Sequence, residues 1–152
     1  EGSEAFAEAK AMVDFAPHRL GHALLLPPLL RQQVMDLKIP VECCPTSNVM
    51  TLELATHCDG NLIEGLQRHP QLAHWLDAQH PMSISTDDSG VFHTNPTREL
   101  LLLSESWNVT HTDLERIVLD SLHHSFDPHI PSMLKDSFLQ IFQDLRKTLS
   151  LR

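Results

Sequence analysis

Short apolar segments alternate with amphipathic segments along the chain, and this alternation constrains the fold more than any other feature of the sequence. A short apolar run bounded by turn residues is typical of a strand buried on both faces, whereas apolar residues at three- and four-residue spacing indicate a helix. The predicted strands are Arg19–Leu26, Pro40–Cys44 and Pro81–Thr86, and the predicted helices are Glu4–Phe15, Pro28–Lys38, Gln71–Gln79, Thr97–Ser106, Asp113–His123 opened by Thr112, and Met133–Leu149 opened by Ser132. This order predicts an α/β fold in which parallel strands alternate with helices.

The residue pattern leaves two parallel architectures open. An open doubly wound sheet and a closed (β/α)8 barrel both contain buried strands that alternate with helices. Three strands are visible in the sequence, and no glycine-rich phosphate-binding turn follows any of them. The choice between an open sheet and a barrel therefore needs further evidence.

Charge and hydropathy exclude two classes of partner. The 152 residues include 11 Lys and Arg against 20 Asp and Glu, so the formal net charge is −9 and the chain repels phosphate backbones and anionic lipid surfaces. The longest apolar run, Ala23–Leu30, contains two prolines and is far shorter than the roughly 20 residues that span a bilayer. We therefore expect neither a nucleic-acid partner nor a membrane partner.

The cysteines and the first residues bear on the location of the protein. The three cysteines, of which Cys43 and Cys44 are adjacent, cannot form a disulfide framework and suit a reducing compartment, so a cytoplasmic location is expected. The first residues have neither an initiator Met nor the basic-then-apolar order of a signal peptide. We expect one domain, or a part of one domain, whose natural N-terminus is missing.

Polar residues that could take part in catalysis or binding lie in or directly after all three predicted strands. Gly21 and His22 lie within the first strand, and Asp87-Asp88 follows the third. Thr46-Ser47-Asn48 follows the second strand, where Pro45–Asn48 is predicted to form a polar turn. The carboxyl ends of parallel strands lie on one face of a sheet, so we expect these residues to meet in a single crevice. They are the candidate functional residues of the chain.

Asp87 and Asp88 are adjacent carboxylates, and their repulsion needs compensation. Like charges about 4 Å apart repel by roughly 4 kcal/mol at an intermediate effective dielectric. A divalent cation bound by Asp87 would offset this repulsion, while Asp88, which points the other way along an extended backbone, could hold a substrate. The alternative is structural, because Asp is common as a helix N-cap and in Asx turns.

His22 also has two interpretations. It is either an imidazole that faces the site or a core histidine that a backbone carbonyl satisfies, and the adjacent Gly21 leaves room for a ligand. The adjacent Cys43 and Cys44 lack the two-residue spacer of a metal or redox motif and are predicted to pack in the core. Six other histidines lie around helices and are interpreted as surface or capping residues: His69, His74, His80, His123, His124 and His129.

Taken together and in order, the strand-end segments resemble the later half of the adenosine deaminase family of aminohydrolases. The matching segments are Arg19-Leu20-Gly21-His22, Cys44-Pro45-Thr46-Ser47-Asn48 and Ser85-Thr86-Asp87-Asp88, supported by His80-Pro81 and by Asp120–Pro128. The likeness covers most of residues 17–130. Within the family, Thr86–Phe92 looks closer to the adenosine-deaminase-like branch that acts on N6-methyl-AMP, because adenosine deaminases proper usually have proline where Ser89 stands.

The resemblance implies a fold, a cofactor and a reaction. It implies a (β/α)8 barrel with one catalytic Zn²⁺ at its C-terminal face, with Asp87 as a zinc ligand and Asp88 hydrogen-bonded to the purine. His22 would orient the attacking water or stabilise the charge that develops on it. A metal lowers the pKa of its bound water to about 7, so the implied reaction is hydrolytic deamination of a purine nucleoside or nucleotide, such as adenosine or N6-methyl-AMP.

The chain departs from the family pattern in its metal ligands. The family also uses a His-x-His pair and a His followed three residues later by a general-acid Glu, and neither occurs here; Glu1 and Glu4 lie near the expected position but lack the histidine. A typical barrel needs about 250 residues. We therefore expect residues 1–152 to form the C-terminal half of one barrel domain, with most zinc ligands outside the chain and no activity alone.

Two further hypotheses remain open from the sequence. The first is a catalytically inactive, truncated α/β domain that retains the sheet for binding or assembly. The second is a metal-dependent amidohydrolase with a substrate other than a purine. A half barrel exposes unpaired strand edges and apolar surface, so self-association is expected in each case.

Overall fold

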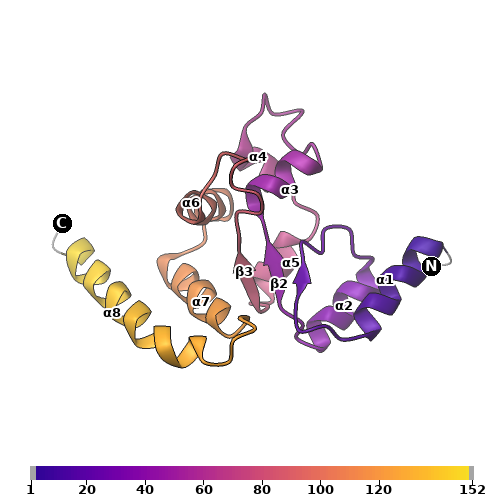
Figure 1. The fold of residues 1–152 in the computed structure, drawn as a ribbon. Coiled ribbons are helices and arrows are strands. Elements are labelled where there is room, and N and C mark those ends of the chain that lie inside the picture. The colour runs from indigo at the N-terminus through magenta and orange to yellow at the C-terminus, as the bar shows by residue number, and fades with distance from the viewer. Residues whose placement is uncertain (1–2, 151–152) are drawn as a thin grey trace.

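A three-stranded parallel sheet lies at the centre of the chain, and helices surround it (Figure 1). A computed structural model describes residues 3–150. The elements are α1 (Glu4–Asp14), β1 (Leu20–Gly21), α2 (Pro28–Asp36), β2 (Val41–Cys43), α3 (Pro45–Thr51), α4 (Leu62–Leu66), α5 (Leu72–Asp77), β3 (Met82–Ile84), α6 (Pro96–Trp107), α7 (His111–Leu122) and α8 (Ile130–Ser150). The strand order is β1-β2-β3, with Val41 of β2 opposite both Leu20 and Met82. The predicted alternation of parallel strands with helices is confirmed.

The first strand is much shorter than the predicted Arg19–Leu26. The strand ends at Gly21, although His22 still donates its backbone N–H to the carbonyl of Glu42 at 2.8 Å. The backbone then enters the left-handed region, with φ of 57° at His22 and 48° at Ala23. Extended pairing cannot continue through two left-handed residues, so the prediction of a long first strand was wrong.

A helix, α3, replaces the polar turn that was predicted after β2. Pro45 occupies the first helical position, where its missing N–H had no intrahelical partner and its fixed φ suits a helix. The backbone N–H of Asn48 donates to the Cys44 carbonyl at 2.8 Å and closes the first turn. The helix buries Thr46, Ser47 and Asn48, which a surface turn would have exposed.

Both predicted capping residues lie inside the first turn of their helix and not before it. Thr110, not Thr112, caps α7: its hydroxyl accepts the backbone N–H of Asp113, whose side chain accepts the backbone N–H of Thr110. This reciprocal pair satisfies two donors at the helix start, which a residue within the first turn cannot do. The last helix begins two residues before Ser132, whose hydroxyl donates to the His129 carbonyl at 2.9 Å.

The hydrophobic core lies where the sheet meets the surrounding helices. Val41 and Cys43 on β2 and Met82 on β3 are each 1% exposed, as central parallel strands require. The helices contribute the remaining members of the core, which include Val13, Leu30, Val34, Leu66, Leu72, Trp75, Leu103 and Ile117. Cys43 and Cys44 are both buried, which confirms their predicted packing role.

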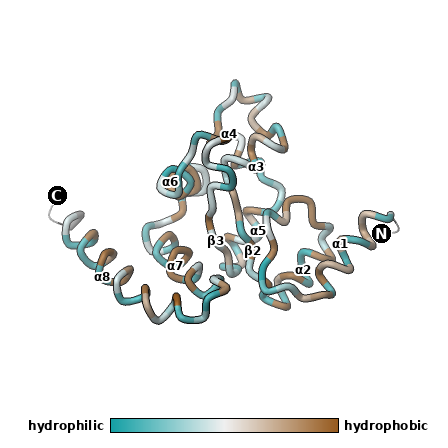
Figure 2. Tube along the Cα trace, in the orientation of Figure 1, coloured by the Kyte–Doolittle hydropathy of each residue, from teal (hydrophilic) through white to brown (hydrophobic). Residues whose placement is uncertain are grey.

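The last helix differs from the rest of the structure because it extends outward from the body. Figure 1 shows α8 as an arm that ends away from the sheet, and it packs mainly against α7. Hydrophobic and hydrophilic residues alternate along this arm (Figure 2), and Met133, Ile141 and Leu145 are exposed. None of the helices that the structure describes is both long and apolar enough to cross a membrane.

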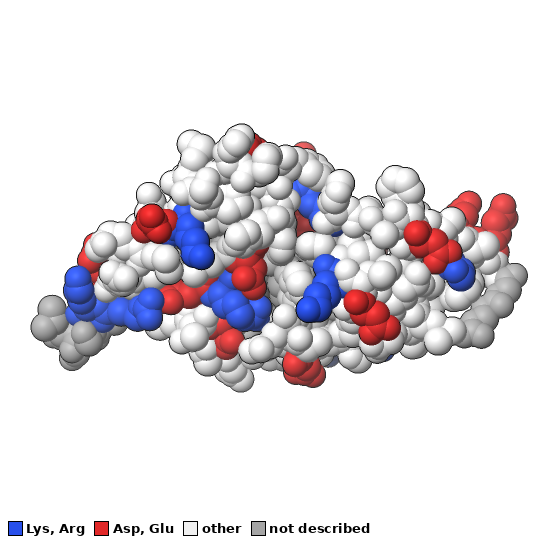
Figure 3. Space-filling model, turned by 90° about the horizontal axis from the view of Figure 1, so that it is seen from below, with Lys and Arg blue, Asp and Glu red and all other residues white. Residues whose placement is uncertain are grey.

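Charged side chains of both signs lie close together on the face seen from below (Figure 3). Several of the exposed charges form ion pairs. Arg146 contacts Glu115 at 3.0 Å, and Arg116 contacts Asp120 at 3.4 Å. Such exposed pairs contribute little to stability individually, about 0 to 1 kcal/mol each.

Candidate active site

The candidate residues of all three strands meet at the carboxyl edge of the sheet. His22 follows β1, Ser47 and Asn48 lie in the first turn of α3 directly after β2, and Asp87 lies beyond β3. The Ser47 hydroxyl donates to Asp87 Oδ2 at 2.7 Å, and His22 Nε2 lies 3.8 Å from the same oxygen. We call these four residues the strand-end cluster. The structure thus brings together side chains that lie far apart in the sequence, as the strand-end argument predicted.

The backbone positions two members of the strand-end cluster in an uncommon conformation. His22 and Asp87 have φ values of 57° and 56°, in the left-handed region that non-glycine residues rarely occupy. Such a conformation costs about 1 to 3 kcal/mol and persists only where the surrounding structure imposes it. The same conformation occurs at eight other non-glycine residues of the described chain, such as Lys38 and Asn108, so it determines how the two side chains are presented beyond their strands and does not by itself mark a site.

One group of side chains within residues 3–150 has the composition and spacing of a metal site. The donor atoms of His22, Cys44 and Asp87 all lie within 4.8 Å of one another. Imidazole nitrogen and carboxylate oxygen are zinc ligands in proteins. The third group fits less well, because burial, with the nearby charges of Glu42 and Asp87, raises the pKa of Cys44 to about 12 and keeps its thiol protonated. The donor set is therefore compatible with Zn²⁺ chiefly through Asp87, with His22 Nε2 placed beside the same carboxylate oxygen.

Asp88 occupies the turn that follows β3. Its Oδ1 accepts the backbone N–H groups of Gly90 at 3.1 Å and Val91 at 3.0 Å, as in an Asx turn. Its own backbone N–H donates to Asp87 Oδ1 at 2.9 Å, which leaves Asp87 Oδ2 directed toward Ser47 and His22. One oxygen of Asp88 thus has the structural role of an Asx turn, as the alternative interpretation of the paired acids predicted. The Asp88 side chain nevertheless remains exposed to solvent next to Asp87.

A buried carboxamide connects the strand-end cluster to the interior. Asn48 is completely buried, and its Oδ1 lies 2.9 Å from His22 Nδ1. Its Nδ2 lies 3.1 Å from His69 Nε2 and 3.7 Å from Cys43 Sγ. Both ring nitrogens of His22 thus have a neighbour, Asn48 on one side and Asp87 on the other. The His22 side chain is 42% exposed and its Nδ1 partner is a side-chain carboxamide, so the interpretation of His22 as a core histidine satisfied by a backbone carbonyl does not hold.

Two of the histidines interpreted as surface or capping residues are buried. His69 and His80 are 5% and 4% exposed, and burial lowers the pKa of both imidazoles, that of His69 to about 4. His69 Nδ1 accepts the backbone N–H groups of Gln71 and Leu72 at 3.2 and 3.0 Å, and His80 Nε2 lies 2.8 Å from the Ile39 carbonyl. The partners of His69 lie two and three residues along the chain, as for a capping residue. The burial of both rings and the Ile39 partner of His80 depend on the tertiary fold, so the sequence pattern did not indicate them.

A buried acid beside the site was also missed. Glu99 on α6 is 0% exposed, and its carboxylate accepts the backbone N–H of Thr46 at 2.9 Å, the Thr46 hydroxyl at 2.6 Å and the Thr94 hydroxyl. It therefore holds the first turn of α3 in place next to the strand-end cluster. The sequence shows Glu99 as one polar residue of a predicted amphipathic helix, and its burial follows only from the tertiary packing.

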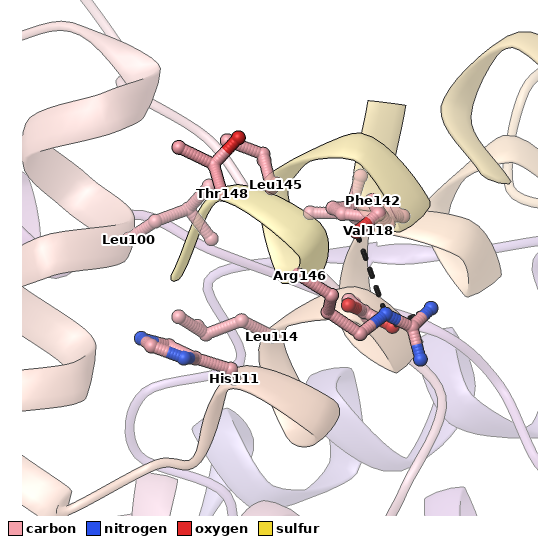
Figure 4. A pocket seen from close by; sticks show the side chains of 9 residues that line it. Leu100, His111, Leu114, Val118, Phe142, Leu145, Arg146 and Thr148 are labelled. Atoms are coloured by element: carbon pink, nitrogen blue, oxygen red, sulfur yellow. Dashed lines mark hydrogen bonds and ion pairs between the residues drawn. The ribbon is translucent and has the colours of Figure 1, made fainter. Parts of the chain in front are cut away.

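Two cavities of the structure differ in composition and in their distance from the strand-end cluster. A cavity of about 420 Å³ is bordered by Thr46, by residues around α4 and by residues of the segment leading into α6. A second, apolar cavity of about 350 Å³ lies between α7 and α8, away from the strand-end cluster (Figure 4). Figure 4 shows Leu114 of α7 and Leu145 of α8 at this second cavity, with the Arg146 side chain extending beside it. The polar chemistry of the chain therefore lies at the strand ends, not between the last helices.

The fold and the site define the class of the protein: an α/β protein with a candidate active site at the carboxyl ends of parallel strands. The sequence model of the family described as adenosine deaminase matches residues 3–136. The chain belongs to the adenosine deaminase family. It is 35% identical over 120 residues to the adenosine deaminase-like protein of Drosophila melanogaster and 30% identical over 125 residues to the N6-methyl-AMP deaminase of Homo sapiens.

These alignments include most of this chain but only part of each relative. They cover 79% and 78% of this chain, against 33% of the fly protein and 32% of the human protein. The chain thus spans about a third of the length of the curated relatives that it matches.

Solved structures confirm the fold. The apo structure of the N6-methyl-AMP deaminase from Arabidopsis thaliana matches with a TM-score of 0.74 and 28% identity over 88% of this chain and 37% of that chain. Arabidopsis ADAL in complex with GMP matches with a TM-score of 0.75 and 27% identity, over 89% of this chain and 37% of that chain. The predicted class, α/β with parallel strands that form part of a (β/α)8 barrel, is therefore confirmed.

Proposed function

We propose that this chain provides the carboxyl-edge part of a zinc-dependent purine deaminase site, in which water replaces the exocyclic amine of a purine nucleoside or nucleotide. The observation that carries the proposal is the convergence of His22, Ser47 and Asp87 at one edge of the parallel sheet. Membership of the adenosine deaminase family supports the same reaction class. The relatives named N6-methyl-AMP deaminase, and an ADAL structure that contains GMP, favour a nucleotide as the substrate.

Asp87 is the proposed zinc ligand. Its Oδ2 already accepts the Ser47 hydroxyl, which fixes the carboxylate, and it lies 3.8 Å from His22 Nε2. When bound, zinc supplies a Lewis acid that makes water a nucleophile near neutral pH. We propose that the remaining ligands and the general-acid glutamate come from outside this chain. Glu4 is exposed in the first turn of α1, and Glu1 lies outside the described residues.

His22 and Asp88 have separate proposed roles. His22 holds the attacking oxygen through Nε2, because its other ring nitrogen is engaged by Asn48. Asp88 binds the purine with the carboxylate oxygen that the Asx turn leaves available, while Oδ1 keeps its two backbone donors. The two acids then do not compete for one cation, because only Asp87 faces His22.

A chimera tests the proposal. Residues 3–136 replace the matching segment of the Drosophila melanogaster adenosine deaminase-like protein, and the chimera is assayed with N6-methyl-AMP, AMP and adenosine, with zinc measured by metal analysis. We expect stoichiometric zinc and release of methylamine or ammonia. Asp87→Ala should abolish zinc occupancy, whereas His22→Gln should retain zinc and lose turnover.

The two substitutions separate the roles. Stoichiometric zinc in the Asp87→Ala chimera would remove the ligand assignment, and unchanged kinetics in the His22→Gln chimera would remove the catalytic one. The 152-residue chain alone is the matched control, and we expect it to bind zinc weakly and to show no turnover. Release of the amine by this chain alone would contradict the proposal that other ligands are needed.

A second candidate function is binding or assembly without catalysis. Two observations favour it: β1 and β3 each pair with β2 on one side within the described sheet, and Leu25, Met50 and Leu101 are exposed. Unpaired edges and exposed apolar side chains promote association. Analytical ultracentrifugation of the chain tests this alternative, which predicts dimers or larger species together with an inactive chimera.

A further inference from the structure

The buried Asn48 carboxamide lies between two imidazoles, so the direction of its hydrogen bonds determines which nitrogen of each ring carries the proton. Asn48 is 0% exposed and His69 is 5% exposed, so water cannot replace a mismatched partner. A buried polar atom without a complementary partner costs about 1 to 3 kcal/mol. The directions of the hydrogen bonds in this group can therefore be worked out from its most rigid member.

The rigid member is His69. Its Nδ1 accepts two backbone N–H groups, from Gln71 at 3.2 Å and Leu72 at 3.0 Å, at the start of α5. A backbone N–H can only donate, so Nδ1 carries no proton. Burial lowers the pKa of His69 to about 4, and its neutral ring has one proton. That proton must lie on Nε2, which becomes a donor toward Asn48.

The same reasoning orients Asn48. If its Nδ2 faced His69 Nε2, two donors would meet at 3.1 Å. Rotating the carboxamide by half a turn exchanges Oδ1 and Nδ2 and leaves the other atoms in place. Oδ1 then also accepts from Cys43 Sγ at 3.7 Å, and burial raises the pKa of that thiol so that it keeps its proton.

We infer that the Asn48 oxygen accepts from His69 and Cys43 while the Asn48 nitrogen donates to His22 Nδ1, so that the neutral His22 ring carries its proton on Nε2 and presents a donor to the site. The observations are the 2.9 Å separation of Asn48 from His22 Nδ1, the complete burial of Asn48 and the two backbone donors to His69. Asn48 and His69 are positioning residues, since they act through His22.

The chemical consequence rests on the proposed function. A neutral His22 with its proton on Nε2 donates a hydrogen bond to an oxygen that approaches Asp87, and it stabilises negative charge on that oxygen. The same nitrogen has no lone pair available to remove a proton. His22 therefore holds and stabilises the attacking oxygen, and it does not act as the base that generates it.

Nitrogen NMR on the ¹⁵N-labelled 152-residue chain, with EDTA present and at a pH where His22 is neutral, tests the inference without catalysis. We expect an unprotonated Nδ1 signal and a protonated Nε2 signal for both His22 and His69. We also expect a coupling through the hydrogen bond from the Asn48 side-chain nitrogen to His22 Nδ1. A coupling from that nitrogen to His69 Nε2, or a protonated Nδ1 on His22, would overturn the inference.

Two near-isosteric variants identify the residue that sets the proton position. Asn48→Asp presents only acceptors, so the His22 proton should move to Nδ1 while His69 stays unchanged. Asp87→Asn is the matched control, and it should leave the His22 proton on Nε2. The opposite pattern would mean that Asp87 sets the proton position and would contradict the inference. If Asn48→Asp does not fold, the coupling in the unaltered chain decides. None of these NMR signals requires turnover. Failure of the deaminase proposal can therefore be distinguished from failure of this inference about the proton positions.

Discussion

The strand-end region and the α8 arm are held by different kinds of interaction, although both belong to one short chain. Around the strand ends, Asn48 and Glu99 are completely buried, and each bonds to groups from distant parts of the sequence. On α8, Leu145 is 53% exposed, and the long-range ion pair of Arg146 with Glu115 lies at the surface. Low exposure with several partners indicates high local stability, whereas exposed contacts indicate local opening at low free energy.

This difference in packing separates the candidate site at the strand ends from the α8 arm. A site that holds His22 and Asp87 in left-handed backbone conformations needs surroundings that impose them, and buried hydrogen bonds in a region of low dielectric do so. An amphipathic helix with one neighbouring helix needs only a stripe of apolar contacts. Three tests of this contrast follow, in order of decreasing expected effect: a pair of leucine truncations, a change of pH and the removal of a surface ion pair.

A matched pair of leucine truncations provides the largest expected contrast. Leu103 is fully buried on α6 and Leu145 is 53% exposed on α8, and both are leucines within helices. Leu103→Ala should lower the free energy of unfolding by about 3 kcal/mol, since it leaves a cavity, while Leu145→Ala should cost less than about 1 kcal/mol. Urea denaturation followed by circular dichroism measures both. Equal losses would show that α8 is as firmly packed as the core.

Lowering the pH should reduce the free energy of unfolding through His69 before the exposed carboxylates become protonated. The folded-state pKa of His69 is about 4, below the ordinary 6.5, because burial disfavours the charged ring. Below pH 6.5 the unfolded chain gains a proton at His69 that the folded chain does not. The contribution of His69 to the free energy of unfolding is therefore fully present above pH 6.5 and is lost between pH 6.5 and about pH 4. His69 alone contributes up to about 3 kcal/mol of this loss, at about 1.4 kcal/mol per pH unit.

Exposed residues provide the control for this pH dependence. Hydrogen bonds from Gln140 lower the pKa of Asp144 on α8 from 3.8, so its contribution is lost only at lower pH. Denaturation at several pH values between 7 and about 4 measures the slope. A chain whose stability stays flat over this window would contradict the neutral, buried state of His69.

The sequence predicted the elements of this fold better than their ends. Short runs rich in apolar residues predicted three parallel strands, because burial on both faces leaves a local signal. The early end of β1 had no such signal, because the left-handed turn at His22 and Ala23 is imposed by the surrounding structure. Likewise Pro45 starts α3 immediately after β2, where the local polar composition indicated a turn.

In the candidate site, too, some residues could be predicted from the sequence and others only from the packing. His22, Asp87 and Ser47 were placed together because parallel strands end on one face, which is a topological argument that needs no knowledge of packing. His69 and Glu99 were missed, because their burial depends on residues some 21 and 53 positions away from them in the sequence. The residues proposed to act directly lie in recognisable motifs, whereas the residues that contact them are recognised only from the structure.

The smallest expected effect concerns the surface pair that joins α8 to α7. The Arg146 side chain is 61% exposed and lies 3.0 Å from Glu115, whose side chain is 18% exposed. Because solvent screens this pair, Arg146→Ala should lower the free energy of unfolding by at most about 1 kcal/mol, with less effect at high salt. A double-mutant cycle with Glu115→Gln isolates the pair energy. A coupling well above about 1 kcal/mol that persists at high salt would show that the arm is fixed by a desolvated contact and would remove the contrast with the strand ends.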